Sequence, residues 1–350
     1  MKRQRQEPAI QVPVSGYSRE VFSERRLSKS IDEQEAIFVP PSLRGTFADK
    51  AKVYWLWIST EYVRSNLLAL RYQKGYRILS YPLIGLASGA AIVASVQTIL
   101  LPSVVQLEWL EMIILFAIIG LVLLGRAIGP HRRWSLERLL AEKLRSMYYL
   151  ALLGVDYGPF GSERTAYKGP TRVDDSWARR VVETTWNQRP RTSVVDAEFD
   201  QARQLIEFGW IGSQMDYHAA RALHYRRLHS IIGFIVMVVF ALTVLLVVAR
   251  LQSFWDLQPA ILADLSLGSV MLPLIGGALI AYEGEGEFRK HVERDSRMTE
   301  MLGTFRNRLK EDVRDIPDLV ALVKDLERVM SREFEEWVGI TWSHEISLHL

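Results

Sequence analysis

The chain has 350 residues, no cysteine and a formal net charge of +3. The lack of cysteine excludes disulfides, thiolate metal sites and cysteine nucleophiles, and the net charge is too small for a general nucleic-acid binder. Apolar residues make up 49% of the chain and cluster into four long runs separated by highly charged segments. This clustering indicates an integral membrane protein rather than a pair of soluble domains.

Residues 1–41 are polar and interrupted by prolines, with little hydrophobic periodicity. We expect a mostly disordered arm here. The arm has no apolar core of the kind that signal peptides contain, so we expect the first apolar run to act as an uncleaved anchor.

Residues 42–154 predict a helix, two membrane spans and a second helix. The first span, 79–101, has about 23 residues and no charge, which at about 1.5 Å per residue crosses a hydrocarbon core of roughly 30 Å. The second span covers 109–129. The helix that follows, 130–153, has an apolar stripe and basic outer faces, which suit either packing on neighbouring helices or contact with anionic lipid. The breadth of the stripe favours packing.

The second half repeats this order after a linker, 155–195, that holds one short helix. Residues 196–312 predict a long helix, spans at 230–249 and 262–282, and a charged helix; 313–350 form a C-terminal amphipathic helix and tail. The fold class is therefore an all-α integral membrane protein. Its four transmembrane helices form two hairpins in a duplicated helix–hairpin–helix unit with long cytoplasmic extensions.

Small residues in two spans are candidates for close helix packing. Gly85 and Gly89 lie four residues apart in the first span, and Gly276 and Gly277 follow Pro273 in the fourth. Small residues at this spacing allow two helices in lipid to approach closely. Two interpretations stay open: packing within one hairpin, or an interface between subunits of a homo-oligomer.

Lysine and arginine crowd the flanks before span 1, after span 2 and before span 3, whereas the two hairpin loops contain almost none. The positive-inside rule therefore places both termini and the middle region in the cytoplasm.

No motif predicts catalysis, a cofactor or a metal site, and we expect the protein not to be an enzyme. The sequence has no Walker, dinucleotide or His-Glu-x-x-His pattern. His218, His224 and His229 are six and five residues apart, so no successive pair shares a helix face well, and an interfacial position explains them better than a metal does. The spans lack acidic residues and lysines near their middle, which argues against a proton-coupled transporter.

Three passages resemble a bacterial group of four-span proteins, which itself resembles the SLATT class of membrane effectors in conflict and antiphage systems. The residues that carry the resemblance are Arg133, Trp134, Arg138, Ala141, Glu142, Leu144 and Arg145 after the first hairpin, Gln214, Tyr217, His218 and Arg221 before the second, and Trp337 near the C-terminus. The resemblance implies an oligomeric inner-membrane effector, pore-forming or membrane-perturbing, that responds to a cytoplasmic signal in antiviral defence. Since no sensor domain precedes the first helix, the resemblance implies that sensing lies either in a partner protein, such as a nucleotide-sensing one, or in the cytoplasmic helices. The alternatives are a non-catalytic scaffold that anchors a soluble protein, or a small ion channel.

Overall fold

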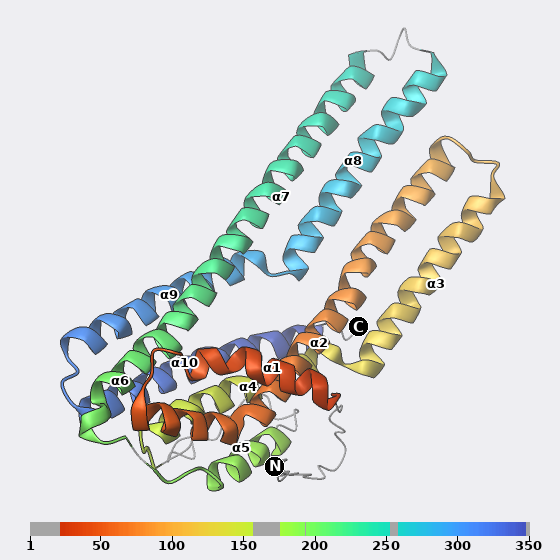
Figure 1. The fold of residues 1–350 in the computed structure, drawn as a ribbon. Helices are drawn as coiled ribbons and strands as arrows, with labels where there is room; N and C mark the ends of the chain where they lie inside the picture. Colours follow the sequence, from red (N-terminus) through yellow and green to blue (C-terminus); the bar gives the residue numbers. More distant parts are fainter. Residues whose placement is uncertain (1–21, 157–175, 193, 253–257, 348–350) are drawn as a thin grey trace. The chain divides into compact units, whose positions relative to one another are not determined.

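The computed structural model describes residues 22–156, 176–192, 194–252 and 258–347, and every element in these ranges is a helix. Four helices are long and apolar enough to cross a membrane (Figure 1). The prediction of an all-α chain with four long apolar helices is therefore confirmed. The chain forms two compact units. Unit 1 comprises Met1–Leu70, Arg132–Trp210 and Phe305–Leu350, and unit 2 comprises Arg71–His131 and Ile211–Thr304.

Unit 1 is a bundle of amphipathic helices around an aromatic core. Its elements are α1 (Glu24–Phe38), the first part of α2 (Gly45–Ile99), α4 (Pro130–Leu152), α5 (Ser176–Asn187), α6 (Phe199–Gln204) and α10 (Ile316–Ser347). The apolar stripe of α4 is buried in this core, including Leu140, Leu144 and Tyr148 at 0% exposure. Helix packing, rather than lipid contact, therefore explains the stripe.

Helix α1 corrects the prediction of a disordered arm over 1–41, which was wrong for residues 24–38. The cause is a tertiary contact. The Phe38 side chain is fully buried, its ring stacks on Trp55 at 4.6 Å between centroids, and its carbonyl oxygen accepts a 2.6 Å hydrogen bond from the Tyr148 hydroxyl. One buried aromatic residue thus fixes the end of α1, and residues 1–21 lie outside the described residues.

Replacing Phe38 by leucine is expected to lower the free energy of unfolding of unit 1 by about 1–2 kcal/mol, because the apolar bulk is retained while the aromatic pairs are lost. Denaturant unfolding of the detergent-solubilised protein, followed by tryptophan fluorescence, would measure the change. Ile37→Leu is the matched control, since Ile37 is 42% exposed. Equal effects of the two substitutions would contradict the role assigned to Phe38.

The helix predicted over 196–227 is not uniform. A 3₁₀ turn (Asp196–Glu198) and α6 lead into a π-helical segment, η2 (Leu205–Gly212), before α7 begins at Ser213. In η2, Trp210 stacks on Tyr149 at 4.5 Å between centroids. A Cβ atom at Gly209 would lie 3.3 Å from the carbonyl oxygen of Ile37. The wider π turn thus accompanies a close approach of η2 to the rest of the core.

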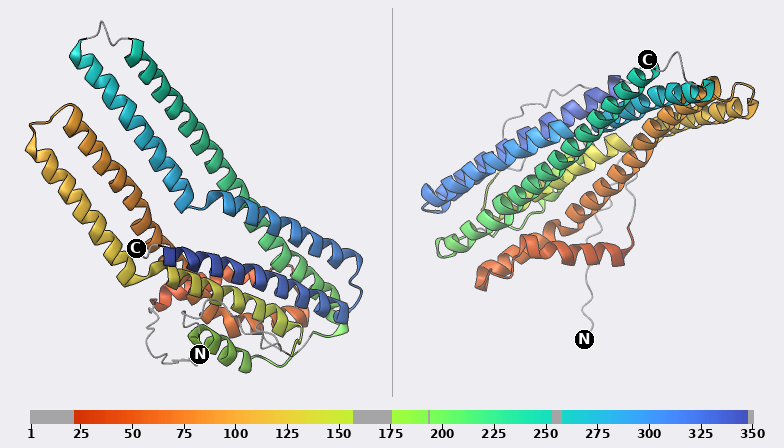
Figure 2. Two further views of the ribbon diagram at one scale, coloured as in Figure 1. Left: turned by 180° about the vertical axis from the view of Figure 1, so that it is seen from behind. Right: turned by 90° about the horizontal axis from the view of Figure 1, so that it is seen from above.

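Unit 2 holds the apolar segments. It contains α2 from Arg71 onward, α3 (Val105–Ile128), α7 (Ser213–Gln252), α8 (Pro259–Glu285) and most of α9 (Phe288–Glu311). Helices α7 and α8 lie side by side in the views of Figures 1 and 2. Pro273 lies inside α8 and does not interrupt it. Near the ends of α2 and α3, the Gln97 amide donates a 3.0 Å hydrogen bond to Glu108.

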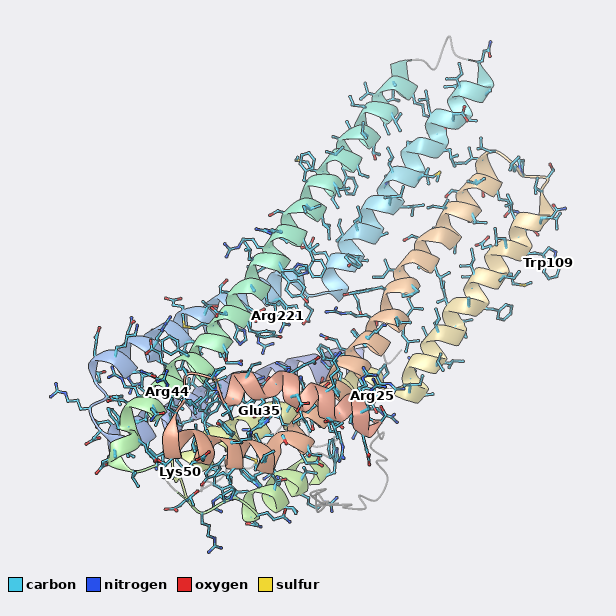
Figure 3. All side chains as sticks on the ribbon, viewed as in Figure 1. Arg25, Glu35, Arg44, Lys50, Trp109 and Arg221 are labelled. Atoms are coloured by element: carbon cyan, nitrogen blue, oxygen red, sulfur yellow. The ribbon has the colours of Figure 1, made fainter. Side chains whose placement is uncertain are left out.

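The apolar segments of unit 2 expose large side chains, as Figure 3 shows for Trp109 on α3. Trp109 is 61% exposed, Phe116 65% and Leu245 on α7 62%. Such exposure of large apolar side chains along whole helices is costly in water and is expected for surfaces that face lipid.

Candidate functional site

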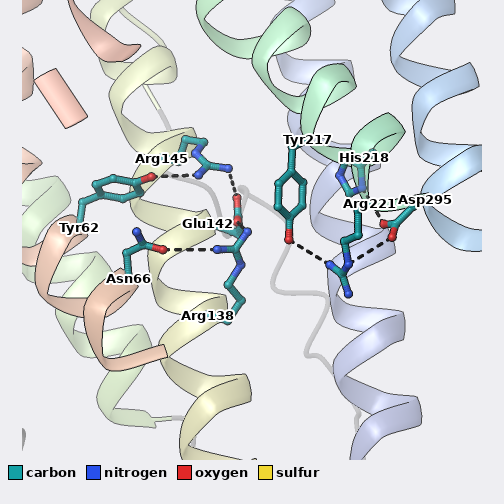
Figure 4. A network of polar contacts seen from close by, with 9 residues as sticks. All are labelled: Tyr62, Asn66, Arg138, Glu142, Arg145, Tyr217, His218, Arg221 and Asp295. Carbon is teal, nitrogen blue, oxygen red and sulfur yellow. Dashed lines mark hydrogen bonds and ion pairs between the residues drawn. The ribbon is translucent and has the colours of Figure 1, made fainter. Parts of the chain in front are cut away.

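A buried polar network joins α7 to α9 in unit 2, beyond the apolar segment of α7. Its centre is Asp295 of α9, whose side chain is fully buried. One carboxylate oxygen lies 2.8 Å from His218 Nδ1, and the other forms an ion pair with Arg221 Nε at 3.3 Å. Arg221 also donates hydrogen bonds to the Tyr217 hydroxyl at 3.0 Å and to His291 Nδ1 at 2.8 Å. Figure 4 shows the His218 and Arg221 side chains of α7 directed toward Asp295, and the Tyr217 hydroxyl directed toward Arg221.

The hydrogen bonds fix the protonation states. Because a carboxylate only accepts, His218 Nδ1 carries the hydrogen that it shares with Asp295. Because a guanidinium only donates, His291 Nδ1 is unprotonated. Burial and the Arg221 charge lower the pKa of His291 to about 3. Burial alone would raise the pKa of Asp295, but the hydrogen bond from His218 and the charge of Arg221 lower it below its ordinary value.

The network predicts that acid destabilises unit 2. His291 is held neutral in the folded protein, so its contribution to the free energy of unfolding is present above its ordinary pKa of 6.5. This contribution is lost as the pH falls from 6.5 towards the folded pKa of about 3, because in that range only the unfolded chain takes up the proton. The lowered pKa of Asp295 adds a further loss in acid, when that carboxylate is protonated. The melting temperature in detergent should therefore fall steadily from pH 6.5 downward.

His291→Gln should flatten this pH dependence. The basic groups that lower the pKa of His291 are Arg221, Arg294 and Arg77, and Asp295 opposes them. His224→Gln is the matched control because the His224 side chain is exposed on α7. An unchanged slope of melting temperature against pH in His291→Gln would exclude His291 as the titrating group.

A second polar network lies within unit 1 and joins α4 to α2. The Glu142 carboxylate binds Arg138 at 2.6 Å and Arg145 at 2.7 Å. Arg145 also donates to the Tyr62 hydroxyl at 2.9 Å, and Arg138 donates to Asn66 at 3.4 Å. Burial alone would lower the pKa of Arg145, but Glu142 and Tyr62 raise it above its ordinary value, so this arginine stays charged inside the unit (Figure 4).

The residues that carry the sequence resemblance largely lie in these networks or beside them. His218 and Arg221 bind Asp295 and Tyr217 binds Arg221, while Arg138, Glu142 and Arg145 belong to the network of unit 1. Three further motif residues are buried: Ala141, Leu144 and Gln214. Arg133 and Trp134 are half-buried, and the Trp337 side chain lies outside the described residues.

Sequence reasoning missed Asp295 and His291, which fell in a helix predicted only to be charged. The signal was present. Asp295 lies seven residues after Phe288 and seven before Leu302, so it falls on the apolar stripe of α9. A carboxylate on a buried stripe needs a cationic or hydrogen-bonding partner. The position of Asp295 on this stripe therefore predicts a buried ion pair or hydrogen bond rather than a carboxylate exposed to solvent.

The candidate packing glycines lie in different surroundings. A Cβ atom at Gly276 would be 3.2 Å from the Phe240 ring of α7, so this glycine allows α8 to approach α7 closely. At Gly85, Gly89 and Gly277 an added Cβ would meet nothing within 4 Å. These three glycines therefore do not serve a close approach to the described part of the chain.

The three histidines flagged in the sequence do not come together. His218 binds Asp295, His229 binds Glu283 at 2.5 Å, and His224 packs against the Tyr225 ring. Among the described residues, no three histidine or acidic side chains lie close enough to hold a metal ion. The arrangement suits a structural ionic lock between helices, in which charge and hydrogen bonding hold α9 against α7.

Comparisons with known protein families, with curated proteins and with solved structures return no match for this chain. The interpretation of its function therefore depends on the chemistry of the two networks and of the apolar helices.

Proposed function

We propose that this protein is a bacterial inner-membrane effector that oligomerises and compromises the membrane when a cytoplasmic signal arrives, in a conflict or defence system. In this proposal the four apolar helices form two transmembrane hairpins, both termini lie in the cytoplasm, and a nucleotide-sensing or other signalling partner supplies the input.

The observation that carries the proposal is the position of the α7–α9 network. Helix α7 is continuous from Ser213 to Gln252, so His218 and Arg221 share one rigid element with the apolar segment 230–249. On the other side, only Gly286 and Glu287 separate α8 from α9, the helix of Asp295. An event that parts α9 from α7 is expected to shift both apolar helices, which is the requirement for a cytoplasmic trigger.

The same chemistry in the two halves supports a duplicated unit. The helix after the second apolar helix carries a half-buried carboxylate that binds arginine, with Glu142 on α4 binding Arg145 of the same helix. The helix after the fourth carries a fully buried carboxylate, Asp295 on α9, which binds Arg221 on α7. Each half therefore has a carboxylate–arginine pair on the helix that follows its second apolar helix.

The open glycines of α2 support assembly. Gly85 and Gly89 lie four residues apart on one face and have open space around them, so a helix of a second copy has room to approach closely. Oligomerisation through this face is the step that would turn single subunits into a membrane-perturbing assembly.

The test is membrane potential, followed with a voltage-sensitive dye in cells induced to express the protein. We expect rapid depolarisation, and its loss in Gly85→Leu/Gly89→Leu. The matched control is Gly120→Leu/Gly125→Leu on α3, where an added Cβ also meets nothing within 4 Å. Intact potential at full expression, together with recovery of one stoichiometric soluble partner, would instead identify a scaffold.

A further inference from the structure

Four aromatic side chains connect four helices of unit 2 at one height along the helix axes, which we call the aromatic level. Tyr81 of α2 packs on Tyr282 of α8 with ring centroids 4.8 Å apart. Phe288 of α9 contacts Tyr282 at 5.6 Å and Tyr225 of α7 at 5.3 Å. This level coincides with the ends of the apolar segments 79–101, 230–249 and 262–282. Aromatic residues of this kind mark the boundary between hydrocarbon and headgroups.

Exposed basic side chains flank the aromatic level. They are Lys74 and Arg77 on α2, within two turns of Tyr81, and Arg226 and Arg227 on α7, next to Tyr225. No ion pair is formed by these four side chains within the described part of the chain, in contrast to the half-buried Arg221 a few residues away. Arg77 also lies close enough to His291 for its charge to lower the pKa of that histidine, which connects the α2 cations to the α9 side of the unit.

Nearby carboxylates are already engaged by other groups. Glu283 binds His229, Glu285 accepts a hydrogen bond from the Tyr76 hydroxyl at 2.5 Å, and Glu287 pairs with Lys290 at 2.8 Å. The four exposed cations therefore keep their charge available for a ligand from outside the protein.

We propose that Lys74, Arg77, Arg226 and Arg227 form a binding surface for the headgroups of anionic phospholipids. The recognised group is a phosphodiester monoanion in a headgroup that carries no compensating cation. Its source is the membrane, because the cations begin where the apolar segments end and their long aliphatic stems can lie along lipid while the charges reach the headgroups. The inference concerns the lipid requirement of the protein and does not depend on whether it perturbs membranes.

The test uses the full-length protein in neutral detergent, titrated with phosphatidylglycerol, phosphatidylcholine or inorganic phosphate while lipid retention is measured by native mass spectrometry. We expect retention of phosphatidylglycerol to exceed that of phosphatidylcholine roughly tenfold or more, since each basic residue adds to the attraction. Lys74→Gln/Arg77→Gln/Arg226→Gln/Arg227→Gln should abolish the preference. The two paired variants, one on each helix, should each reduce it.

The matched control removes four exposed cations that lie elsewhere: Arg25→Gln/Arg44→Gln/Arg191→Gln/Arg314→Gln. It should keep the preference. An equal loss in the control would show general charge attraction and overturn the proposal, as would equal retention of the two lipids. Displacement of phosphatidylglycerol by inorganic phosphate at equal concentration would assign the surface to a soluble anion. A melting temperature in neutral detergent with phosphatidylcholine equal to that of the unaltered protein confirms that each variant is folded.

Discussion

Asp295→Ala is expected to lower the free energy of unfolding of unit 2 by about 3–5 kcal/mol, because removing one partner of a buried ion pair leaves the other charge uncompensated. The side chain of Asp295 has no exposed surface, and that of Arg221 is 21% exposed. Alanine would leave the charge of Arg221 without its counter-ion and the donor hydrogen of His218 without its acceptor, and water has little access to replace the carboxylate.

Hydrogen exchange measured by mass spectrometry would localise the effect. Peptides of α9 should exchange faster in Asp295→Ala, whereas peptides of the unit 1 core should not. The matched control is Glu293→Ala on the same helix, whose pair with Arg289 is 58% and 79% exposed and should contribute less than about 1 kcal/mol. If the two variants exchange alike, the buried network does not hold α9 in place.

Double substitution separates the ion pair from its desolvation cost. Arg221→Leu alone should also destabilise the unit, because it leaves Asp295 buried without its cation. Asp295→Leu/Arg221→Leu should lose less than the sum of the two single changes, since neither charge is then left behind. If the protein functions as proposed, Asp295→Ala should also depolarise cells without any added signal, because the lock between α7 and α9 is already weakened.

The apolar helices were predictable because lipid imposes one simple requirement. A membrane span must form all the hydrogen bonds of its own backbone and expose apolar side chains over the thickness of the hydrocarbon core. The segments 79–101 and 230–249 can therefore be recognised as spans without knowledge of any partner. The limits of α4 also followed from local chemistry: Pro130 begins the helix, and Gly154, at φ +74°, follows its end.

The features that sequence reasoning missed are those fixed by tertiary contacts. Phe38 is a single aromatic residue at the end of a polar segment, and its burial depends on Trp55 and Tyr148 of other helices. The π-helical segment depends in the same way on Tyr149. The pattern of Tyr217, His218 and Arg221 was recognised, but its partner Asp295 lies 77 residues beyond His218. No local rule of spacing determines which helix such a side chain meets.

Glu142→Ala is the second substitution with a large expected effect, about 3–5 kcal/mol on the unfolding of unit 1. Glu142 binds two arginines, at 2.6 Å and 2.7 Å. Without it, Arg145 keeps the Tyr62 hydroxyl as its acceptor among the described residues (Figure 4). The cations of Arg138 and Arg145, four residues before and three after position 142, then repel each other inside the unit. Glu142→Gln should recover part of the loss, because the amide oxygen still accepts one hydrogen bond.

Unfolding in denaturant, monitored by tryptophan fluorescence, would compare Glu142→Ala with Glu61→Ala. Glu61 is the matched control because it binds Arg64 at 2.7 Å with the same 18% exposure as Glu142. The comparison therefore tests the burial of Arg145, whose side chain is 15% exposed against 29% for Arg64. If Glu142→Ala lowers the free energy of unfolding no more than Glu61→Ala does, solvent replaces the carboxylate, and the charge of Arg145 does not depend on Glu142 for its stabilisation. A larger loss would establish Glu142 as the residue that permits two arginines to remain charged at the contact of α4 with α2.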